Sequence, residues 1–74
     1  MNRLEEIFEN KRINLGINKL DFVYKELGIT YPTYQTLIGK HKDLSNIQIN
    51  TLNKVSNYLG ISNTELLKLA KEKV

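Results

Sequence analysis

Residues 20–40 read LDFVYKELGITYPTYQTLIGK, a stretch that predicts a short helix, a tight turn and a second short helix. Phe22 is expected to pack in the core, with an exposed contact for a partner as the alternative. Gly28 stands where a helix C-terminus favours a residue that adopts a left-handed backbone, so the first helix should end at residue 27. Helical spacing predicts one buried face for this helix, made of Leu20, Val23, Tyr24 and Leu27.

The turn and the second helix follow from the next ten residues. Ile29 should fill the turn, and Thr30 should cap the next helix by accepting a hydrogen bond from a first-turn N–H. Pro32 falls in that first turn, where its missing N–H costs nothing. Because the turn is too short for antiparallel helices, the two should cross steeply and leave the second helix exposed. Its inward face is predicted to hold Tyr34, Leu37 and Ile38.

Two segments resemble one protein family. Residues 20–40 resemble the helix-turn-helix of the Cro/CI-type (XRE-like) DNA-binding repressors, and residues 27–30, Leu-Gly-Ile-Thr, match the Leu-Gly-Val-Ser turn of that family closely. Residues 51–67, TLNKVSNYLGISNTELL, resemble the fourth helix, the corner and the start of the fifth helix of that family. The resemblance implies an all-α, lambda-repressor-like bundle of about five short helices, forming a single domain over residues 1–74. Tyr24 stands where the family usually has a small residue, so either its ring requires a wider helix crossing or the register of this helix is shifted by one residue.

A further helix is predicted at the N-terminus, before the helix-turn-helix stretch. Asn2 can cap it, with Glu5 three residues further on as in a capping box. Residues 13–18, INLGIN, are predicted to be a connector, with a short strand as the alternative. The inner face of this helix should hold Leu4, Ile7 and Phe8.

The C-terminal half predicts two more helices. Ser62 with Glu65 is a second capping box and marks the start of the last helix. In that helix, residues 66, 67 and 70 should face the core, with Leu69 partly outside. The helix before it should span about 48–59 and end at Gly60, with an apolar face of Ile49, Leu52, Val55 and Leu59.

Length and composition limit what can stabilise the domain and which partners it can bind. A chain of 74 residues without cysteine makes one small domain that has no disulfide or thiolate metal site, so helix packing must stabilise it, with a homodimer interface as an added source. The net charge of +3 fits either solubility or a polyanion partner. Residues 1–12 do not form a signal peptide, and no apolar run approaches the ~18 residues of a membrane span. We therefore expect a cytoplasmic protein with no membrane partner.

The resemblance implies a sequence-specific regulator of transcription that binds double-stranded DNA, a small Cro-like repressor of a phage or other mobile element. The second helix of the helix-turn-helix would enter the major groove. It would meet base edges through Tyr31, Pro32, Thr33, Gln35 and Thr36. Gln35 is the best candidate to contact adenine, and Thr36 or Pro32 suits the thymine methyl group. Phosphate contacts are expected from Asn18, Lys19, Lys40, His41 and Lys42. Between residues 29 and 42 there is no acidic residue to repel phosphate.

The alternative function is a protein-interaction module, antirepressor-like, that uses the same fold to bind another regulator. Tyr31, Pro32 and Tyr34 would suit that use, because aromatic residues anchor interfaces. We predict no enzyme, since the sequence holds no nucleophile–base arrangement and no Gly-rich phosphate loop. No cofactor, metal or small-molecule ligand is predicted either, because the single histidine, His41, has too few partners for a metal site.

Overall fold

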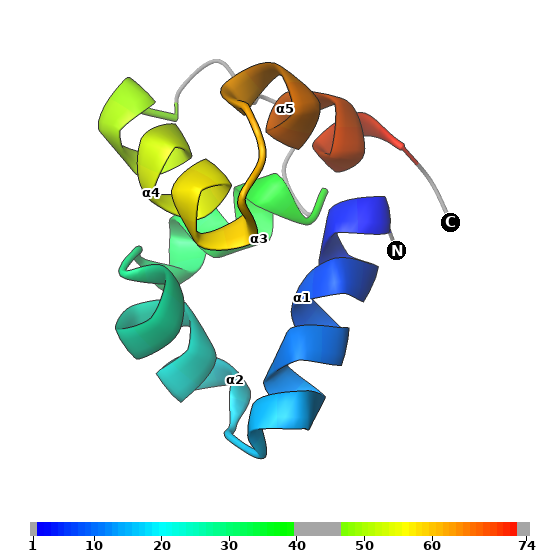
Figure 1. Cartoon of the computed structure of the whole chain (residues 1–74). Helices are drawn as coiled ribbons and strands as arrows, with labels where there is room; N and C mark the ends of the chain where they lie inside the picture. The colour runs from blue at the N-terminus through cyan, green and yellow to red at the C-terminus, as the bar shows by residue number, and fades with distance from the viewer. Residues whose placement is uncertain (1, 40–46, 73–74) are drawn as a thin grey trace.

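The computed structural model describes residues 2–39 and 47–72, and among these residues it has five helical segments and no strand (Figure 1). The segments are α1 (Arg3–Leu15), α2 (Lys19–Asp21), which continues into the π-helix η1 (Phe22–Leu27), α3 (Tyr31–Leu37), α4 (Ile49–Leu59) and α5 (Asn63–Lys71). Helix α5 packs against α1 and α4, and η1 contacts α3 and α4. The predicted all-α bundle is confirmed.

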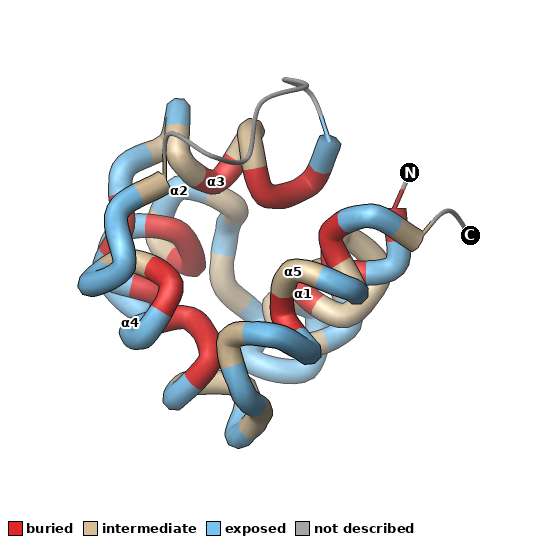
Figure 2. The backbone as a smooth tube through the Cα atoms, turned by 90° about the horizontal axis from the view of Figure 1, so that it is seen from above, coloured by how far each residue is buried: buried red, intermediate tan, exposed pale blue. Residues whose placement is uncertain are grey.

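One hydrophobic core joins α1, η1, α3, α4 and α5, and the buried stretches turn toward the middle of the molecule (Figure 2). The ring of Phe8 from α1 lies 5.8 Å from Phe22 and 5.5 Å from Tyr34, measured between centroids. Aromatic pairs at such distances contribute about 0.5–1.5 kcal/mol beyond their buried area. Because Phe8 contacts both rings, α1 fixes η1 and α3 relative to one another. The fully buried side chains are Leu4, Phe8, Phe22, Val23, Tyr34, Leu37, Val55 and Leu66.

The predicted helix ends are largely confirmed. The side chains of Asn2 and Asn18 cap α1 and α2, and the hydroxyl of Ser62 accepts from the N–H of Glu65 at 3.1 Å. Gly28 ends η1 with φ +70°, a left-handed conformation that a residue with a Cβ adopts only under strain. Ile29 fills the turn as expected and is buried.

The predicted face of the first motif helix is wrong in two positions. Leu20 and Tyr24 are 57% and 52% exposed, whereas Phe22, placed off that face, is fully buried. The reason is the π-helix: the N–H of Gly28 donates to the carbonyl of Val23, five residues back. This wider turn brings residues five apart, such as Phe22 and Leu27, onto one side of the helix. Tyr24 therefore lies outside the helix crossing, and Phe22 packs in the core as predicted.

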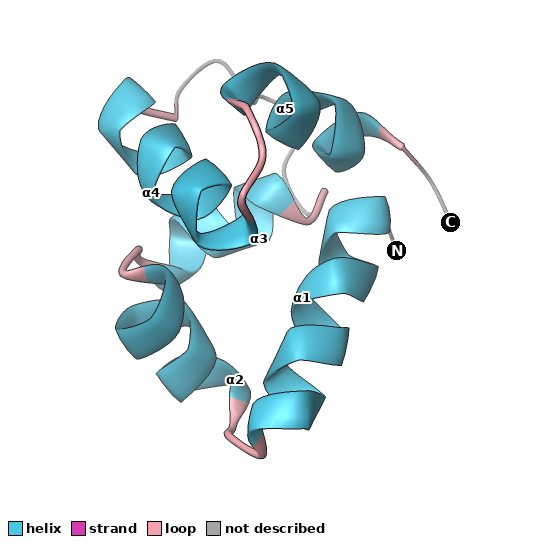
Figure 3. Ribbon diagram, in the orientation of Figure 1, coloured by secondary structure: helices cyan, strands magenta, loops and turns pink. Residues whose placement is uncertain are grey.

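Two further predictions need correction. Helix α1 continues through Ile13 to Leu15, so no strand forms there and the connector begins only at Gly16 (Figure 3). Ile13 and Leu15 are exposed because this last turn extends beyond the core. Ile49 was predicted on the buried face of α4, yet it opens that helix and is 60% exposed. The buried face of α4 is formed instead by Leu52, Val55 and Ser56.

Asn2 does more than cap α1. Its side chain is buried, and its Oδ1 accepts from the N–H of Glu5 at 2.8 Å. Its Nδ2 donates to the carbonyl of Leu37 at 2.9 Å and to that of Ala70 at 3.0 Å. These carbonyls lie at the C-terminal ends of α3 and α5, where the helix itself offers no N–H partner. One amide therefore joins three helix ends.

The Asn2→Asp variant separates this role from capping. Asp caps a helix as well as Asn does, so a residue that only capped α1 would tolerate the change. Here a carboxylate oxygen would replace Nδ2 and face two carbonyl oxygens. We expect a loss of about 1–3 kcal/mol in the free energy of unfolding, the usual effect of leaving buried polar groups unpaired. Urea denaturation at pH 7 measures it, with Asn18→Asp at the exposed cap of α2 as the control. Equal midpoints for Asn2→Asp and wild type would contradict the bridging role.

Candidate nucleic-acid interface

Helix α3 presents one fixed face to solvent. Tyr34 and Leu37 are almost completely buried, and Ile38 is 6% exposed, as predicted from their spacing. The rotation of α3 about its axis is therefore set by the core. Helical position places four of the five predicted base-contact residues on the outer side. Pro32 is exposed, and the other three are half-buried: Thr33, Gln35 and Thr36.

Tyr31, the fifth predicted base-contact residue, lies at the edge of this face. Its ring stacks on that of Tyr34 with a centroid distance of 5.9 Å, and it is half-buried. Much of the ring is thus used in packing. The side chain of Gln35 is half-buried, and its amide makes no hydrogen bond to the residues that the structure describes.

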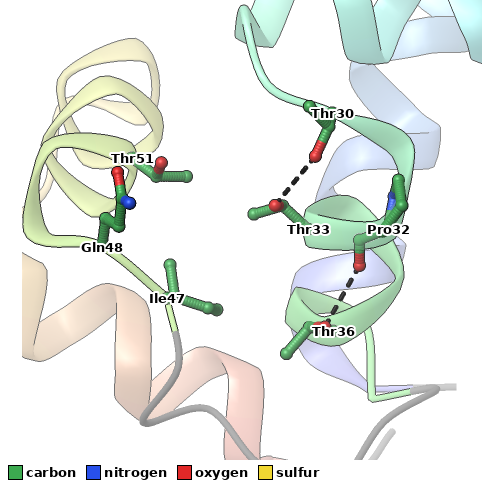
Figure 4. Close-up of a pocket in the computed structure, with 7 residues that line it drawn as sticks. All are labelled: Thr30, Pro32, Thr33, Thr36, Ile47, Gln48 and Thr51. Carbon is green, nitrogen blue, oxygen red and sulfur yellow. Dashed lines mark hydrogen bonds between the residues drawn. The ribbon is translucent and has the colours of Figure 1, made fainter.

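An open hollow of about 420 Å³ lies between α3 and the start of α4 (Figure 4). Three of the predicted base-contact residues, Pro32, Thr33 and Thr36, line it, whereas Tyr31 and Gln35 do not. Sequence reasoning missed the opposite wall, because only the folded chain brings the start of α4 beside α3. The described residues that line it are uncharged: Thr30, Pro32, Thr33, Thr36, Ile47, Gln48 and Thr51.

The threonine hydroxyls beside α3 bond within the protein. Thr30 stands at the N-cap position of α3, but its side chain does not cap the helix, contrary to prediction. Its Oγ1 lies 3.0 Å from Oγ1 of Thr33 instead. The hydroxyl of Thr36 donates to the carbonyl of Pro32 at 3.1 Å. Three of the threonine hydroxyls that line the hollow, those of Thr30, Thr33 and Thr36, therefore already have partners.

Tyr24 takes over part of the missing cap. The N–H of Tyr31, the first residue of α3, donates to the hydroxyl of Tyr24 at 3.3 Å. Pro32 has no N–H, so in this first turn only the N–H of Thr33 remains without a partner among the described residues. On the other side of the turn, Nζ of Lys54 donates to the carbonyl of Gly28 at 3.4 Å. Sequence reasoning missed both contacts, since each crosses between helices.

Removing the Tyr24 hydroxyl tests this contact. In Tyr24→Phe the ring stays, and we expect only a small loss of stability, about 0.5 kcal/mol, because the bond is exposed. The amide of Tyr31 should exchange with solvent faster, which NMR hydrogen exchange measures residue by residue. Tyr58→Phe is a matched control, because the Tyr58 hydroxyl bonds to Glu26 at 3.3 Å and not to α3. Unchanged exchange at Tyr31 in Tyr24→Phe would show that the hydroxyl does not hold α3.

The predicted phosphate contacts divide into two groups. Lys40, His41 and Lys42 lie outside the described residues, so their contacts stay predictions. Asn18 and Lys19 lie at the start of α2, where Oδ1 of Asn18 accepts from the N–H of Asp21 at 2.8 Å. Nζ of Lys19 lies 3.7 Å from a carboxylate oxygen of Glu9 on α1. Lys19 is thus ion-paired within the protein, although its side chain remains 40% exposed.

Glu9 organises the junction between α1 and α2. Its second carboxylate oxygen lies 2.6 Å from Nε of Arg12, and Nη1 of Arg12 donates to the carbonyl of Ile17 in the connector at 3.0 Å. The hydrogen bond from Arg12 lowers the pKa of Glu9, with a further contribution from the charge of Lys19. The same bond raises the pKa of the Arg12 guanidinium.

This shift predicts a pH dependence of stability. Because the pKa of Glu9 is lower in the folded than in the unfolded protein, its stabilising effect is present above the unfolded pKa near 4.5 and is lost as the pH falls through the folded pKa. Glu9→Gln should therefore be less stable than wild type at pH 7, and the difference should shrink below about pH 4. Urea denaturation of both proteins from pH 7 to pH 3 measures this. Parallel stability curves would argue against a perturbed Glu9.

Other kinds of site find no support in the part of the chain that the structure describes. None of its helices is long and apolar enough to cross a membrane. No group of three or more His, Cys, Asp or Glu residues there could hold a metal ion. A scan against protein-family models finds no match, and searches of curated proteins and of solved structures find none either. The resemblance to the Cro/CI-type repressors therefore stays a prediction from the sequence.

Proposed function

We propose that the protein is a sequence-specific regulator that binds double-stranded DNA by placing α3 in the major groove. The observation that supports this most directly is the outer face of α3, which is polar and uncharged on a helix whose rotation the core fixes. A helix of 7 residues is about 10 Å long, and the major groove is about 12 Å wide. A short helix held in this way can enter the groove without rearranging the bundle.

The side chains on this face match the chemistry of base edges. The Gln35 amide can donate to adenine N7 and accept from its N6 amino group. Pro32 and the methyl groups of Thr33 and Thr36 offer apolar contact to thymine. With no Arg on this face, A·T pairs are favoured over guanine. Positive charge to attract the DNA backbone comes in sequence directly after α3, from Lys40 and Lys42.

The biological role rests on the resemblance to Cro/CI-type repressors: a small repressor of a phage or other mobile element. If the protein works as a homodimer, its operator should contain two half-sites with centres about 10 bp apart, one helical turn of DNA.

A specific observation favours a second candidate, an antirepressor-like module that binds another regulator. Leu20 and Tyr24 are more than half exposed on the first helix of the motif, and Ile13 is 64% exposed at the end of α1. Large apolar side chains in such positions suit a protein partner. The experiment below distinguishes the two functions.

Gln35→Ala tests base readout. It should leave the melting temperature nearly unchanged, because Gln35 is only half-buried and bonds to no described residue. Affinity for the selected operator should fall by about 1–3 kcal/mol, the usual contribution of a good bidentate contact, and the preference at one or two base pairs should relax. Non-specific affinity and its salt dependence should stay the same, because no charge is altered.

Selection from randomised duplexes, with wild type and variant in parallel, measures these effects. Asn10→Ala, which removes an exposed amide from α1, serves as the control and should retain the wild-type motif. If Gln35→Ala enriches the wild-type motif equally well, Gln35 does not read bases. If wild type enriches no motif at all, the protein-interaction module replaces the DNA-binding function.

A further inference from the structure

The segment formed by α2 and η1 has one exposed apolar side. Phe22, Val23 and Leu27 are buried, whereas Leu20 and Tyr24 are 57% and 52% exposed. In Figure 1 the segment lies at the lower left edge of the molecule, and η1 contacts α3 and α4. Side chains four residues apart on a helix are neighbours along its surface. Leu20 and Tyr24 therefore form a short apolar row on the outside of the bundle.

A pair of opposite charges with the same spacing lies beside this apolar row. Asp21 follows Leu20 in the sequence, and Lys25 follows Tyr24. Oδ1 of Asp21 lies 3.8 Å from Nζ of Lys25, and the side chain of Lys25 is 75% exposed. Because an exposed ion pair of this length is weak, both groups can also pair with a charge on another molecule. The outer side of the segment thus carries an apolar row and a charged row.

These two rows are complementary to their own copy when that copy runs in the opposite direction. In an interface with two-fold symmetry, a contact from residue i to residue j is repeated from j to i. An axis through the middle of the segment brings Leu20 near Tyr24 of the second copy, and Asp21 near Lys25 of the second copy. Each contact is then made twice. A parallel arrangement would instead place each charge opposite the same charge, which is unfavourable.

We propose that the exposed side of α2 and η1 binds a second copy of this chain in antiparallel orientation. The tyrosine ring suits such a contact, since aromatic residues are enriched in interfaces. Because the surface is small, self-association should be weak and should depend on concentration. The four residues involved are Leu20, Asp21, Tyr24 and Lys25. None of them is assigned to a base or a phosphate, so this interface does not depend on DNA binding.

Sedimentation velocity of the free protein, from micromolar to millimolar concentration, measures the dimer. Wild type should shift from monomer toward dimer as the concentration rises. Leu20→Ala should weaken dimerisation about tenfold or more, since each substitution alters two symmetry-related contacts. Leu20 is a better choice than Tyr24, whose hydroxyl also accepts from the N–H of Tyr31. Ile49→Ala removes a similarly exposed side chain at the start of α4, so this matched control should dimerise as wild type does.

Charge reversal tests the antiparallel arrangement. Asp21→Lys and Lys25→Glu each place like charges opposite one another, so each variant alone should dimerise less than wild type. An equal mixture of the two should form a heterodimer, because the two lysines of one variant then face the two carboxylates of the other. Native mass spectrometry identifies the heterodimer by its mass. Circular dichroism checks each fold, and Lys25→Glu alone supplies the charge test should Asp21→Lys, in the first turn of α2, not fold.

Three outcomes would overturn this interface. The first is a wild type that stays monomeric up to millimolar concentration, which leaves the exposed side to a different protein. The second is a Leu20→Ala variant that dimerises as strongly as wild type. The third is a mixture of folded charge-reversed variants that forms no more heterodimer than homodimer. No DNA is present in these measurements, so they leave the test of the proposed function separate.

Discussion

The side-chain amide of Asn2 is the contact on which the arrangement of the helices depends. It satisfies an N–H at the start of α1 and carbonyls at the ends of α3 and α5, across separations of 35 and 68 residues. Buried amides of this kind are costly unless every polar atom is paired, and here all three interactions are made. The C-terminal end of α3 therefore has one position relative to α1 and α5.

The other end of α3 is fixed by different means. Tyr24 accepts from the first N–H of the helix, and the buried side chains of Tyr34 and Leu37 set its rotation. The geometry of the exposed face of α3 thus depends on groups that do not lie on that face. A substitution at Asn2 or Tyr24 can alter what α3 presents while leaving every outward residue unchanged. Effects on binding and on stability are expected to be linked at those two positions and separable at Gln35.

Whether the sequence predicts a feature of this structure depends on how far apart in the sequence the interacting residues lie. Caps and glycine ends are local, so Asn18, Gly28 and Ser62 could be placed from their neighbours alone. The face of the first motif helix could not, because the spacing rule assumes a regular α-helix and η1 is wider. The outward residues of α3 follow from helix position, whereas the hollow requires α4 beside α3. The side-chain N–H groups of Asn2 donate to carbonyls that lie far away in the sequence, and no local pattern of residues predicts those partners.

The uncapped start of α3 and the paired hydroxyls of Thr30 and Thr33 have a common cause. If Thr30 capped α3, its hydroxyl would turn to the N–H of Thr33, and the Thr33 hydroxyl would lose its partner. That hydroxyl would then need solvent or a ligand, and a polar group would face the hollow. The hydroxyl of Tyr24 accepts from the first N–H of α3, and Pro32 has no N–H. These two positions of the first turn therefore need no side-chain cap. The exposed tyrosine, the proline and the paired threonines therefore form one arrangement, which orders the start of α3 without a side-chain cap from Thr30.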